Sequence, residues 1–175
     1  MTADGTAVIS AHGLRLRKWT PEDLPVLRDL FDDPDVAYRT PLAAPFDAAA
    51  ARAYLDGAIG APRRLHLAIT TDGRTALGEV LLNRDLRSIG YVVGAAHRGR
   101  GLAVRALRAL RAMTEYAHRA EGMDRVLLEI EPDNAASAAV ARSAGYRRAE
   151  VGPETVTDKG RTYELLTWEH LAPAD

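Results

Sequence analysis

The chain has 175 residues, of which 47% are hydrophobic and 27% are charged, as expected for one globular domain with a sizeable core. The formal net charge of −1 gives no overall attraction to nucleic acid or to an anionic membrane, and we expect neither as a partner. The absence of cysteine excludes a disulfide scaffold, a thiolate nucleophile and a cysteine-based zinc site. No signal-peptide pattern or membrane-spanning apolar run is present, so we expect a cytoplasmic protein. Abundant Ala and Arg with almost no Lys is typical of GC-rich bacterial genomes.

The first third of the chain predicts a strand followed by two helices. Residues 1–11 have no periodic apolar pattern, and we expect a flexible tail. Residues 12–18 alternate Leu with Arg, which predicts a half-buried strand. Thr20, followed by Pro, is a typical cap for a first helix. A Pro-containing loop over residues 40–45 then leads to a second helix capped by Asp47.

The remainder of the chain alternates strands and helices. A long amphipathic helix is expected over residues 102–121 and a short one over 134–144. Strands are expected over residues 65–70, 75–82, 88–93, 125–131, 146–151 and 163–168. An Asp-Gly pair between the first two of these strands indicates a hairpin. The pattern therefore predicts an α/β domain over residues 12–175, with a mixed, mostly antiparallel sheet of seven strands and about four helices.

The most informative segment runs from Gly90 to Ala103, where an apolar strand enters an Arg/Gly-rich turn that opens into the long helix. Glycines in the turn let the main chain approach a ligand closely. The first amides of the helix have no partners within it and lie at the positive end of its dipole. With Arg98 and Arg100 they predict a site for a pyrophosphate. The chain lacks both the Gly-Lys-Ser/Thr loop and the G-x-G-x-x-G fingerprint of the common nucleotide sites.

Residues 98–103 read Arg-Gly-Arg-Gly-Leu-Ala and resemble the acyl-coenzyme A loop, Arg/Gln-x-x-Gly-x-Gly/Ala, of the GNAT N-acetyltransferase superfamily. The N-x-x-S block at residues 134–137, the Gly-Tyr that follows, and the opening segment 14–23 resemble its RimJ/RimL-like branch. The resemblance implies a single-domain GNAT fold with acetyl-CoA as cofactor. The residues that it implies for cofactor binding are Val92, Val93, Arg98, Gly99, Arg100, Gly101, Leu102, Ala103, Asn134 and Ser137.

The family reaction is direct attack of a primary amine on the thioester in a ternary complex, and a chain without cysteine fits it because no acyl-cysteine can form. Main-chain amides around residues 92–95 are implied for the thioester oxygen. Ser137 is implied as the donor to the leaving thiolate, although it also suits an ordinary helix surface. Many GNATs place a tyrosine four residues later, where this chain has Ala141, so Ser137 or water must serve. Asn134 suits both a helix cap and a pantetheine contact.

The general base is less clearly indicated. Ser88 stands where many members of the superfamily place a glutamate. Glu79, Glu129 and Glu131 lie on neighbouring predicted strands, and Glu154 lies in the predicted loop before the last strand. Glu154 matches a glutamate thought to act in the RimL-like branch, with Glu79 as the alternative. A carboxylate with an ordinary pKa near 4.3 suits a water relay better than direct proton abstraction.

Other charged residues have simpler interpretations. The five histidines lack metal-ligand spacing, so no metal site is expected. Arg105, Arg108, Arg111 and Arg119 suit a solvated helix face. Arg84 and Arg87 could meet the carboxylate of a succinyl donor.

The resemblance leaves the acceptor open. A protein N-terminal amine fits the branch, whereas aminoglycosides, polyamines and amino acids are acceptors elsewhere in the fold. In the superfamily, residues 38–46 would line the acceptor side. Ser88 and Ala141 also allow a non-catalytic acyl-CoA-binding module, because both depart from common catalytic positions. Dimers are common in the family, so a homodimer is allowed, but no surface is indicated.

Overall fold

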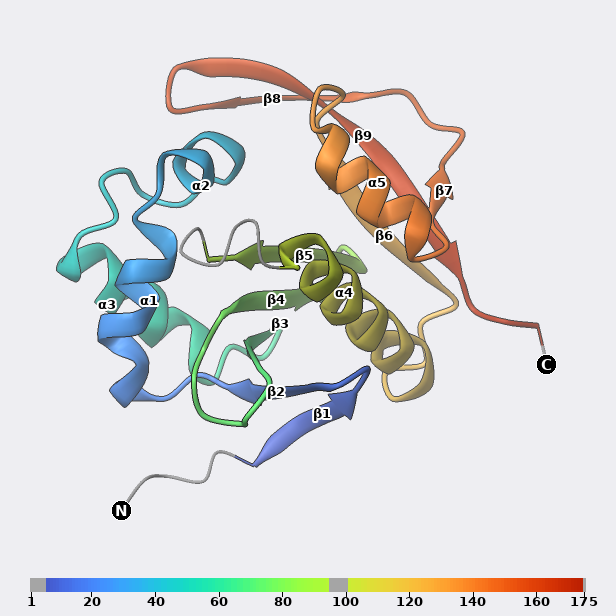
Figure 1. Ribbon diagram of the computed structural model, residues 1–175. Coiled ribbons are helices and arrows are strands. Elements are labelled where there is room, and N and C mark those ends of the chain that lie inside the picture. The colour runs from blue at the N-terminus through green and yellow to red at the C-terminus, as the bar shows by residue number, and fades with distance from the viewer. Residues whose placement is uncertain (1–5, 95–100, 175) are drawn as a thin grey trace.

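The computed structural model of the protein describes residues 6–94 and 101–174, and only the main chain at Leu102. Figure 1 shows a twisted sheet with helices packed on both of its faces. The strands are β1 (Ala7–Ala11), β2 (Leu14–Lys18), β3 (Arg64–Thr70), β4 (Gly78–Asn83), β5 (Ser88–Val93), β6 (Arg125–Ile130), β7 (Arg147–Arg148), β8 (Glu154–Asp158) and β9 (Arg161–Leu171). The helices are the 3₁₀ turn η1 (Pro21–Asp23) and α1 (Leu24–Phe31), α2 (Pro34–Arg39), α3 (Ala48–Ala58), α4 (Leu102–Arg119) and α5 (Ala135–Ser143).

The predicted fold class is confirmed, whereas the predicted number of elements is too low. Across the described residues the sheet has nine strands in the order β1-β2-β3-β4-β5-β6-β9-β7, with β8 paired to β9. The flexible tail predicted over residues 1–11 is wrong for Ala7–Ala11, which forms β1 and pairs with β2. β8 is mostly exposed and polar. Both strands were missed because neither has the regular burial of alternate residues that produces a period-two pattern.

Other differences lie at element boundaries. α1 ends at Phe31, and Pro34 begins a further helix, α2, which Asp33 caps by accepting from the amides of Asp35 and Val36. The strand predicted over residues 146–151 is reduced to β7, and the last strand, predicted over 163–168, extends to the eleven residues of β9.

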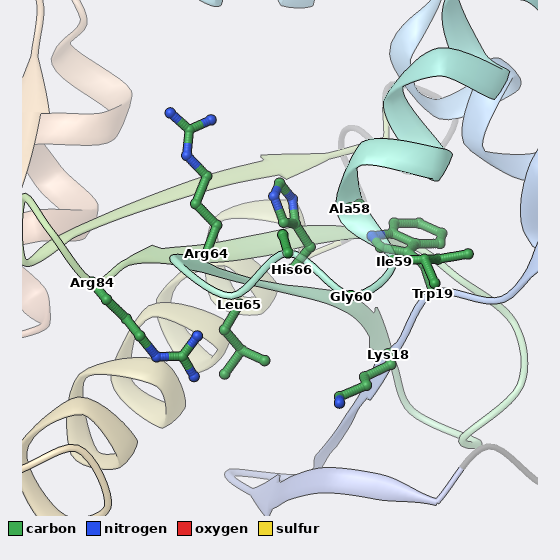
Figure 2. A pocket seen from close by; sticks show the side chains of 10 residues that line it. Lys18, Trp19, Ala58, Ile59, Gly60, Arg64, Leu65, His66 and Arg84 are labelled. Carbon is green, nitrogen blue, oxygen red and sulfur yellow. The ribbon is translucent and has the colours of Figure 1, made fainter.

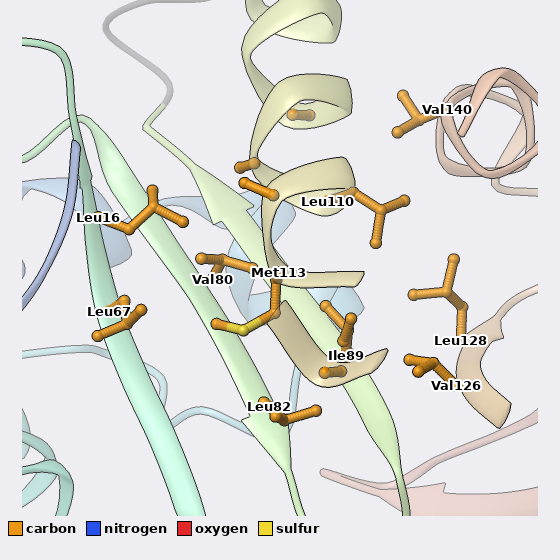
Figure 3. Close-up of a cluster of buried hydrophobic side chains, with 14 of the residues drawn as sticks. Leu16, Leu67, Val80, Leu82, Ile89, Leu110, Met113, Val126, Leu128 and Val140 are labelled. Atoms are coloured by element: carbon orange, nitrogen blue, oxygen red, sulfur yellow. The ribbon is translucent and has the colours of Figure 1, made fainter. Parts of the chain in front are cut away.

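Alternating side chains divide the interior into two cores, one on each face of the sheet. On the α4 face, Leu110 and Met113 of α4 meet Val80, Leu82 and Ile89 of the sheet (Figure 3). On the opposite α1 face, Trp19, Leu27, Phe31 and Leu55 pack with Ala68 beneath α1 and α3. Because neighbouring residues of a strand point to opposite faces, Tyr91 packs on the α4 core and Val92 on the α1 core.

The sheet is least continuous between β5 and β6, which are its parallel neighbours. Their pairing consists of the Ser88–Leu127 bridge, and the Leu127 amide donates to the Arg87 carbonyl at 2.8 Å. By contrast, β4 and β5 pair at six positions, and so do β6 and β9. Beyond Ser88, β5 has no partner in β6 among the described residues. We call this opening the β5–β6 divergence.

Within residues 6–94 and 101–174, no helix has the length and apolar character needed to cross a bilayer. The same residues hold no cluster of three or more His, Cys, Asp or Glu side chains suited to a metal ion.

Candidate functional site

The edge of β5 presents main-chain groups to the β5–β6 divergence. The Gly94 amide donates to the Leu77 carbonyl at 2.9 Å, in the register that also pairs Val92 with Glu79. Because alternate residues of a strand direct their amides to opposite neighbours, Val92 faces β4, whereas Tyr91 and Val93 face the divergence. Of the two predicted valines, Val93 therefore has the available amide, and the main chain of Val92 is engaged by β4.

The N-terminus of α4 opens toward the same end of β5. Gly101 precedes the helix with φ of +76°, a left-handed conformation that favours glycine, and its carbonyl accepts from the Arg105 amide at 2.9 Å. Leu102 and Ala103 form the first turn, where helix amides have no partners within the helix. The predicted residues Arg98, Gly99 and Arg100 lie outside the described residues.

Arg105 differs from the solvated arginine predicted at its position. One of its guanidinium nitrogens, Nη1, is buried and has no hydrogen-bond partner among the described residues. This nitrogen belongs to a half-buried side chain in the first turn of α4, where the helix dipole favours an anionic ligand.

Helix α5 presents the predicted Asn134 and Ser137. Asn134 caps the helix as predicted, because its Oδ1 accepts from the Ser137 amide at 3.2 Å. Burial raises the pKa of the Tyr91 phenol on β5, and the nearby, half-buried Ser137 opposes that shift. The structure therefore brings β5 and α5 together at Ser137. Ala141, at the position of the family tyrosine, is fully buried and has no polar group to offer.

Glu79 lies on the α1 face in a buried polar cluster. Its Oε2 accepts from Trp19 Nε1 at 2.6 Å and lies 3.5 Å from Nδ1 of His66, and its Oε1 accepts from the Tyr54 hydroxyl. Burial, followed by the charge of Glu79, raises the pKa of Tyr54, so the phenol stays a donor. Both oxygens of Glu79 are thus engaged, and the residue is 4% exposed.

Glu154 lies in β8, not in a loop, and it faces another carboxylate. Glu129 is flanked in β6 by Leu128 and Ile130 of the α4 core, so its own side chain points to the α1 face. Thr167 of β9 donates to Glu129 at 3.0 Å. Desolvation raises the pKa of Glu129 and the nearby charge of Glu154 raises it further, against the hydrogen bond from Thr167. Sequence analysis placed Glu129 near the site without assigning it a role.

The tip of the β8–β9 hairpin lies beside α2 (Figure 1), and Arg161 donates to the Tyr38 carbonyl at 2.6 Å. Glu131 is buried and accepts from Arg39 at 3.0 Å and from Arg161 at 2.8 Å. Arg161 also stacks on the ring of Tyr38, 3.9 Å from its centroid. Lys159 donates to the carbonyls of Ala37 and Thr40 at 2.7 and 2.9 Å. These contacts place part of the predicted acceptor segment, residues 38–46, against the hairpin.

A surface cavity of about 130 Å³ lies at the start of β3, between Trp19, His66 and the end of α3 (Figure 2). None of the predicted cofactor-binding or catalytic residues lines it, whereas Arg84, considered for a succinyl carboxylate, does. Arg84 at its edge is held by Glu121 at 2.7 Å, and Arg87 pairs with Asp124 at 3.0 Å. Both arginines considered for a succinyl carboxylate therefore already have acidic partners.

Comparison with known proteins agrees with this arrangement. Residues 13–147 match the family model described as acetyltransferase (GNAT) domain. No curated protein sequence matches the chain significantly.

Similar solved structures cover most of the chain. They include an acetyltransferase (GNAT family) from Bacillus anthracis, with a TM-score of 0.79, 19% identity, and coverage of 93% of this chain and 97% of that one. Mycobacterium smegmatis RimJ in complex with CoA-disulfide has a TM-score of 0.78 and 20% identity over 94% of this chain and 85% of that one. Spermidine N-acetyltransferase from Vibrio cholerae, in complex with CoA and spermine, has a TM-score of 0.73 and 15% identity over 91% and 95%. At these identities the similarity shows a shared fold.

Proposed function

Because the chain belongs to the GNAT acetyltransferase family, whose members use acetyl-CoA, we propose that it acetylates a protein N-terminal amine by direct attack in a ternary complex. The observation that carries the proposal is the β5–β6 divergence, which lies between the free N-terminus of α4 and the Ser137 face of α5.

The described residues suit acetyl-CoA. The first amides of α4, with Gly101 at its start, would hold the pyrophosphate, and the unpartnered Nη1 of Arg105 adds positive charge there. Arg98, Gly99 and Arg100 remain part of this proposed loop. The amide of Val93 would donate to the thioester oxygen, and Asn134 and Ser137 would border the pantetheine arm. Acetyl-CoA, when bound, supplies the activated acetyl thioester.

The proposed donor and acceptor groups lie on opposite faces of the sheet. Ser137 is on the α4 face, where its hydroxyl would donate to the leaving sulfur. Glu129 and Glu154 are on the α1 face, where they would accept the amine proton through water. The pKa of Glu129 is raised, which moves this carboxylate toward the range of a useful base. Glu79 is less suited, because Trp19 and Tyr54 already donate to its two oxygens.

Charge on the acceptor side favours a single amine over a polycation. Glu131 is neutralised by Arg39 and Arg161, which leaves the pair Glu129 and Glu154 to receive positive charge. Arg39 and Arg161 are in turn balanced by Glu131 and Asp133, so the nearby Lys159 is the cation that would repel further ammonium groups of a polyamine or an aminoglycoside. A peptide N-terminus carries one ammonium at its end and fits this distribution.

Calorimetric titration with acetyl-CoA, followed by thiol-release assays on peptide, polyamine and aminoglycoside acceptors, tests the proposal. We expect micromolar binding and release with peptides bearing a free N-terminus, but not with the same peptides after N-terminal blocking. Release with polyamines alone would refute the acceptor assignment. Tight binding without release for any amine would favour the non-catalytic module, and no binding would refute the site itself.

A further inference from the structure

The β5–β6 divergence has a closed end and an open end, and different contacts join its two sides at each end. The Ser88–Leu127 bridge joins them at the closed end. β5 and β6 run parallel from this bridge toward Val93 and Ile130, so these two residues mark the open end. Glu131 directly follows Ile130, and it accepts hydrogen bonds from both α2 and the β8–β9 hairpin, whose tip lies beside α2 (Figure 1).

On the α1 face of the sheet, the apolar core does not extend across the divergence. Among the described residues, the α1 core contains no side chain of β6, β7, β8 or β9. Val36 anchors α2 in this core, so α2 belongs with the half of the sheet from β1 to β5. The hairpin belongs to the other half, because β9 pairs with β6 at six positions. The contact between α2 and the hairpin is thus a polar connection between two halves that share no core on this face.

Arg161 of the hairpin makes much of this connection. Its two terminal nitrogens donate to the two oxygens of Glu131 at 2.9 and 2.8 Å, and Nη2 also donates to the Tyr38 carbonyl at 2.6 Å. The guanidinium lies 3.9 Å from the ring centroid of Tyr38 and 4.0 Å from that of Tyr163. The side chain of Glu131 is only 6% exposed, so this pair is shielded from solvent on one side. A guanidinium fork on a carboxylate fixes orientation as well as distance.

We propose that Arg161 is a positioning residue that holds α2 and the hairpin at a fixed separation across the open end of the divergence, and so aligns the acceptor amine with the thioester. This inference rests on the proposed function. That function assigns the thioester oxygen to the Val93 amide in one half of the sheet, and the proton-accepting pair Glu129 and Glu154 to the other half. The two groups therefore act on one amine only if the halves keep their spacing.

Alignment of this kind has a large effect on rate. Attack on a bound thioester requires a near-attack geometry, and a displacement of about 1 Å can cost about 10²-fold. On the α4 face, the α4 core includes residues of both halves and holds the cofactor side in place. On the α1 face, Arg161 and its partners perform this task for the acceptor side. Arg161 itself does not reach the reacting atoms, because Glu131 and Tyr38 engage its guanidinium.

Arg161→Gln tests the inference by removing the fork while keeping a polar side chain. The value of kcat/KM for a peptide with a free N-terminus should fall about tenfold, because charge-assisted hydrogen bonds are the strong ones. The calorimetric Kd of acetyl-CoA should stay unchanged. Amide hydrogen exchange of α2 should become faster, while that of α4 keeps the wild-type rate. Arg161→Lys keeps the charge but not the fork, and it should recover little of the lost activity.

Arg125→Gln is the matched control. Nε of Arg125 donates to Glu169 at 2.7 Å, and both residues lie in the half of the sheet from β6 to β9. The substitution therefore breaks an arginine–glutamate pair of similar length that does not cross the divergence. It should leave both kcat/KM for the peptide and the exchange of α2 at wild-type values.

The outcomes separate this inference from the proposed function. Wild-type kcat/KM in Arg161→Gln, or unchanged exchange of α2, would overturn the role of Arg161 alone. Equal losses of acetyl-CoA affinity and of kcat/KM would indicate a general structural role and also overturn it, as would full recovery by Arg161→Lys. Absence of turnover with any amine in the wild type would overturn the proposed function and this inference with it.

Discussion

Gly78, the first residue of β4, holds β5 in the position that the proposed site requires. A Cβ added there would lie 3.0 Å from the Cα of Val93 and still closer to the carbonyl oxygen of Val92. Both contacts are to main chain, which cannot rotate away as a flexible side chain can. Gly78→Ala must therefore push the end of β5 away from β4 and strain the hydrogen bond from the Gly94 amide to Leu77.

The expected loss of stability is the sum of two costs, the overfilling of the interior and the loss of a main-chain hydrogen bond. Overfilling a packed interior costs about 1–3 kcal/mol, and loss of one main-chain hydrogen bond adds about 0.5–1.5 kcal/mol. We expect Gly78→Ala to lower the free energy of unfolding by about 2–4 kcal/mol. Displacement of the Val93 amide should also weaken acetyl-CoA binding by about fivefold, the equivalent of about 1 kcal/mol.

Urea denaturation of the free protein measures the first effect and calorimetry the second. Gly90→Ala is the matched control, because Gly90 lies in the same strand pair and a Cβ there meets nothing within 4 Å. It should change stability by less than about 1 kcal/mol, in the stabilising direction. Equal stability of the two variants would refute the argument that close approach of β4 and β5 requires a glycine at position 78.

The paired carboxylates, the cap of α5 and a histidine pair each give a further test. Glu154→Gln removes a charge that raises the pKa of Glu129, so the alkaline-rising limb of kcat should move to lower pH; an unmoved limb in rate assays would contradict the pairing. Asn134→Ala should cost about 1 kcal/mol of unfolding free energy in urea through the lost cap, and an unchanged midpoint would contradict it. Burial lowers the pKa of His170 below its usual 6.5, and the charge of His118 lowers it further. Nε2 of His118 lies 2.9 Å from Nδ1 of His170. The unfolded chain therefore binds this proton more readily, and stability should fall as the pH drops below about 6.5; His170→Phe should lose that part of the pH dependence in melting experiments.

The sequence predicted the elements that have a regular apolar period and the helix that begins with a capping residue. Alternation in β2 and the apolar stripe of α4 placed those elements correctly, because one buried face imposes a regular period. The cap of α5 was recognised from Asn134 alone, since a cap is a local interaction. β1 and β8 were missed because their pairing comes from distant strands, while their own residues lack the pattern of a half-buried strand.

The site divides in the same way. The glycine-led start of α4 and the Asn134–Ser137 block could be found from local motifs, whereas Glu129 and Tyr91 could not. Their environments depend on Glu154 and Ser137, which other elements bring to them. The positions of Glu129 in β6 and Tyr91 in β5 predict the face of the sheet on which each side chain lies. They do not predict which side chain of another element lies beside it. Successive residues of a strand direct their amides to opposite neighbours. Val92 and Val93 are adjacent in sequence and therefore offer their amides to different neighbours.

The single Ser88–Leu127 bridge also affects how the molecule opens. The segment from β1 to β5 and the segment from β6 to β9 are each held by ladders of several residue pairs, yet across the sheet they share one pair, with α4 packed over both. Local opening follows the boundary with the fewest cooperative contacts, so amide hydrogen exchange should begin along this boundary before either ladder separates. A ligand that contacts both sides would suppress that opening and raise the melting temperature with its concentration. The discontinuity proposed to admit a ligand would thus also make the folded state sensitive to the amount of ligand present.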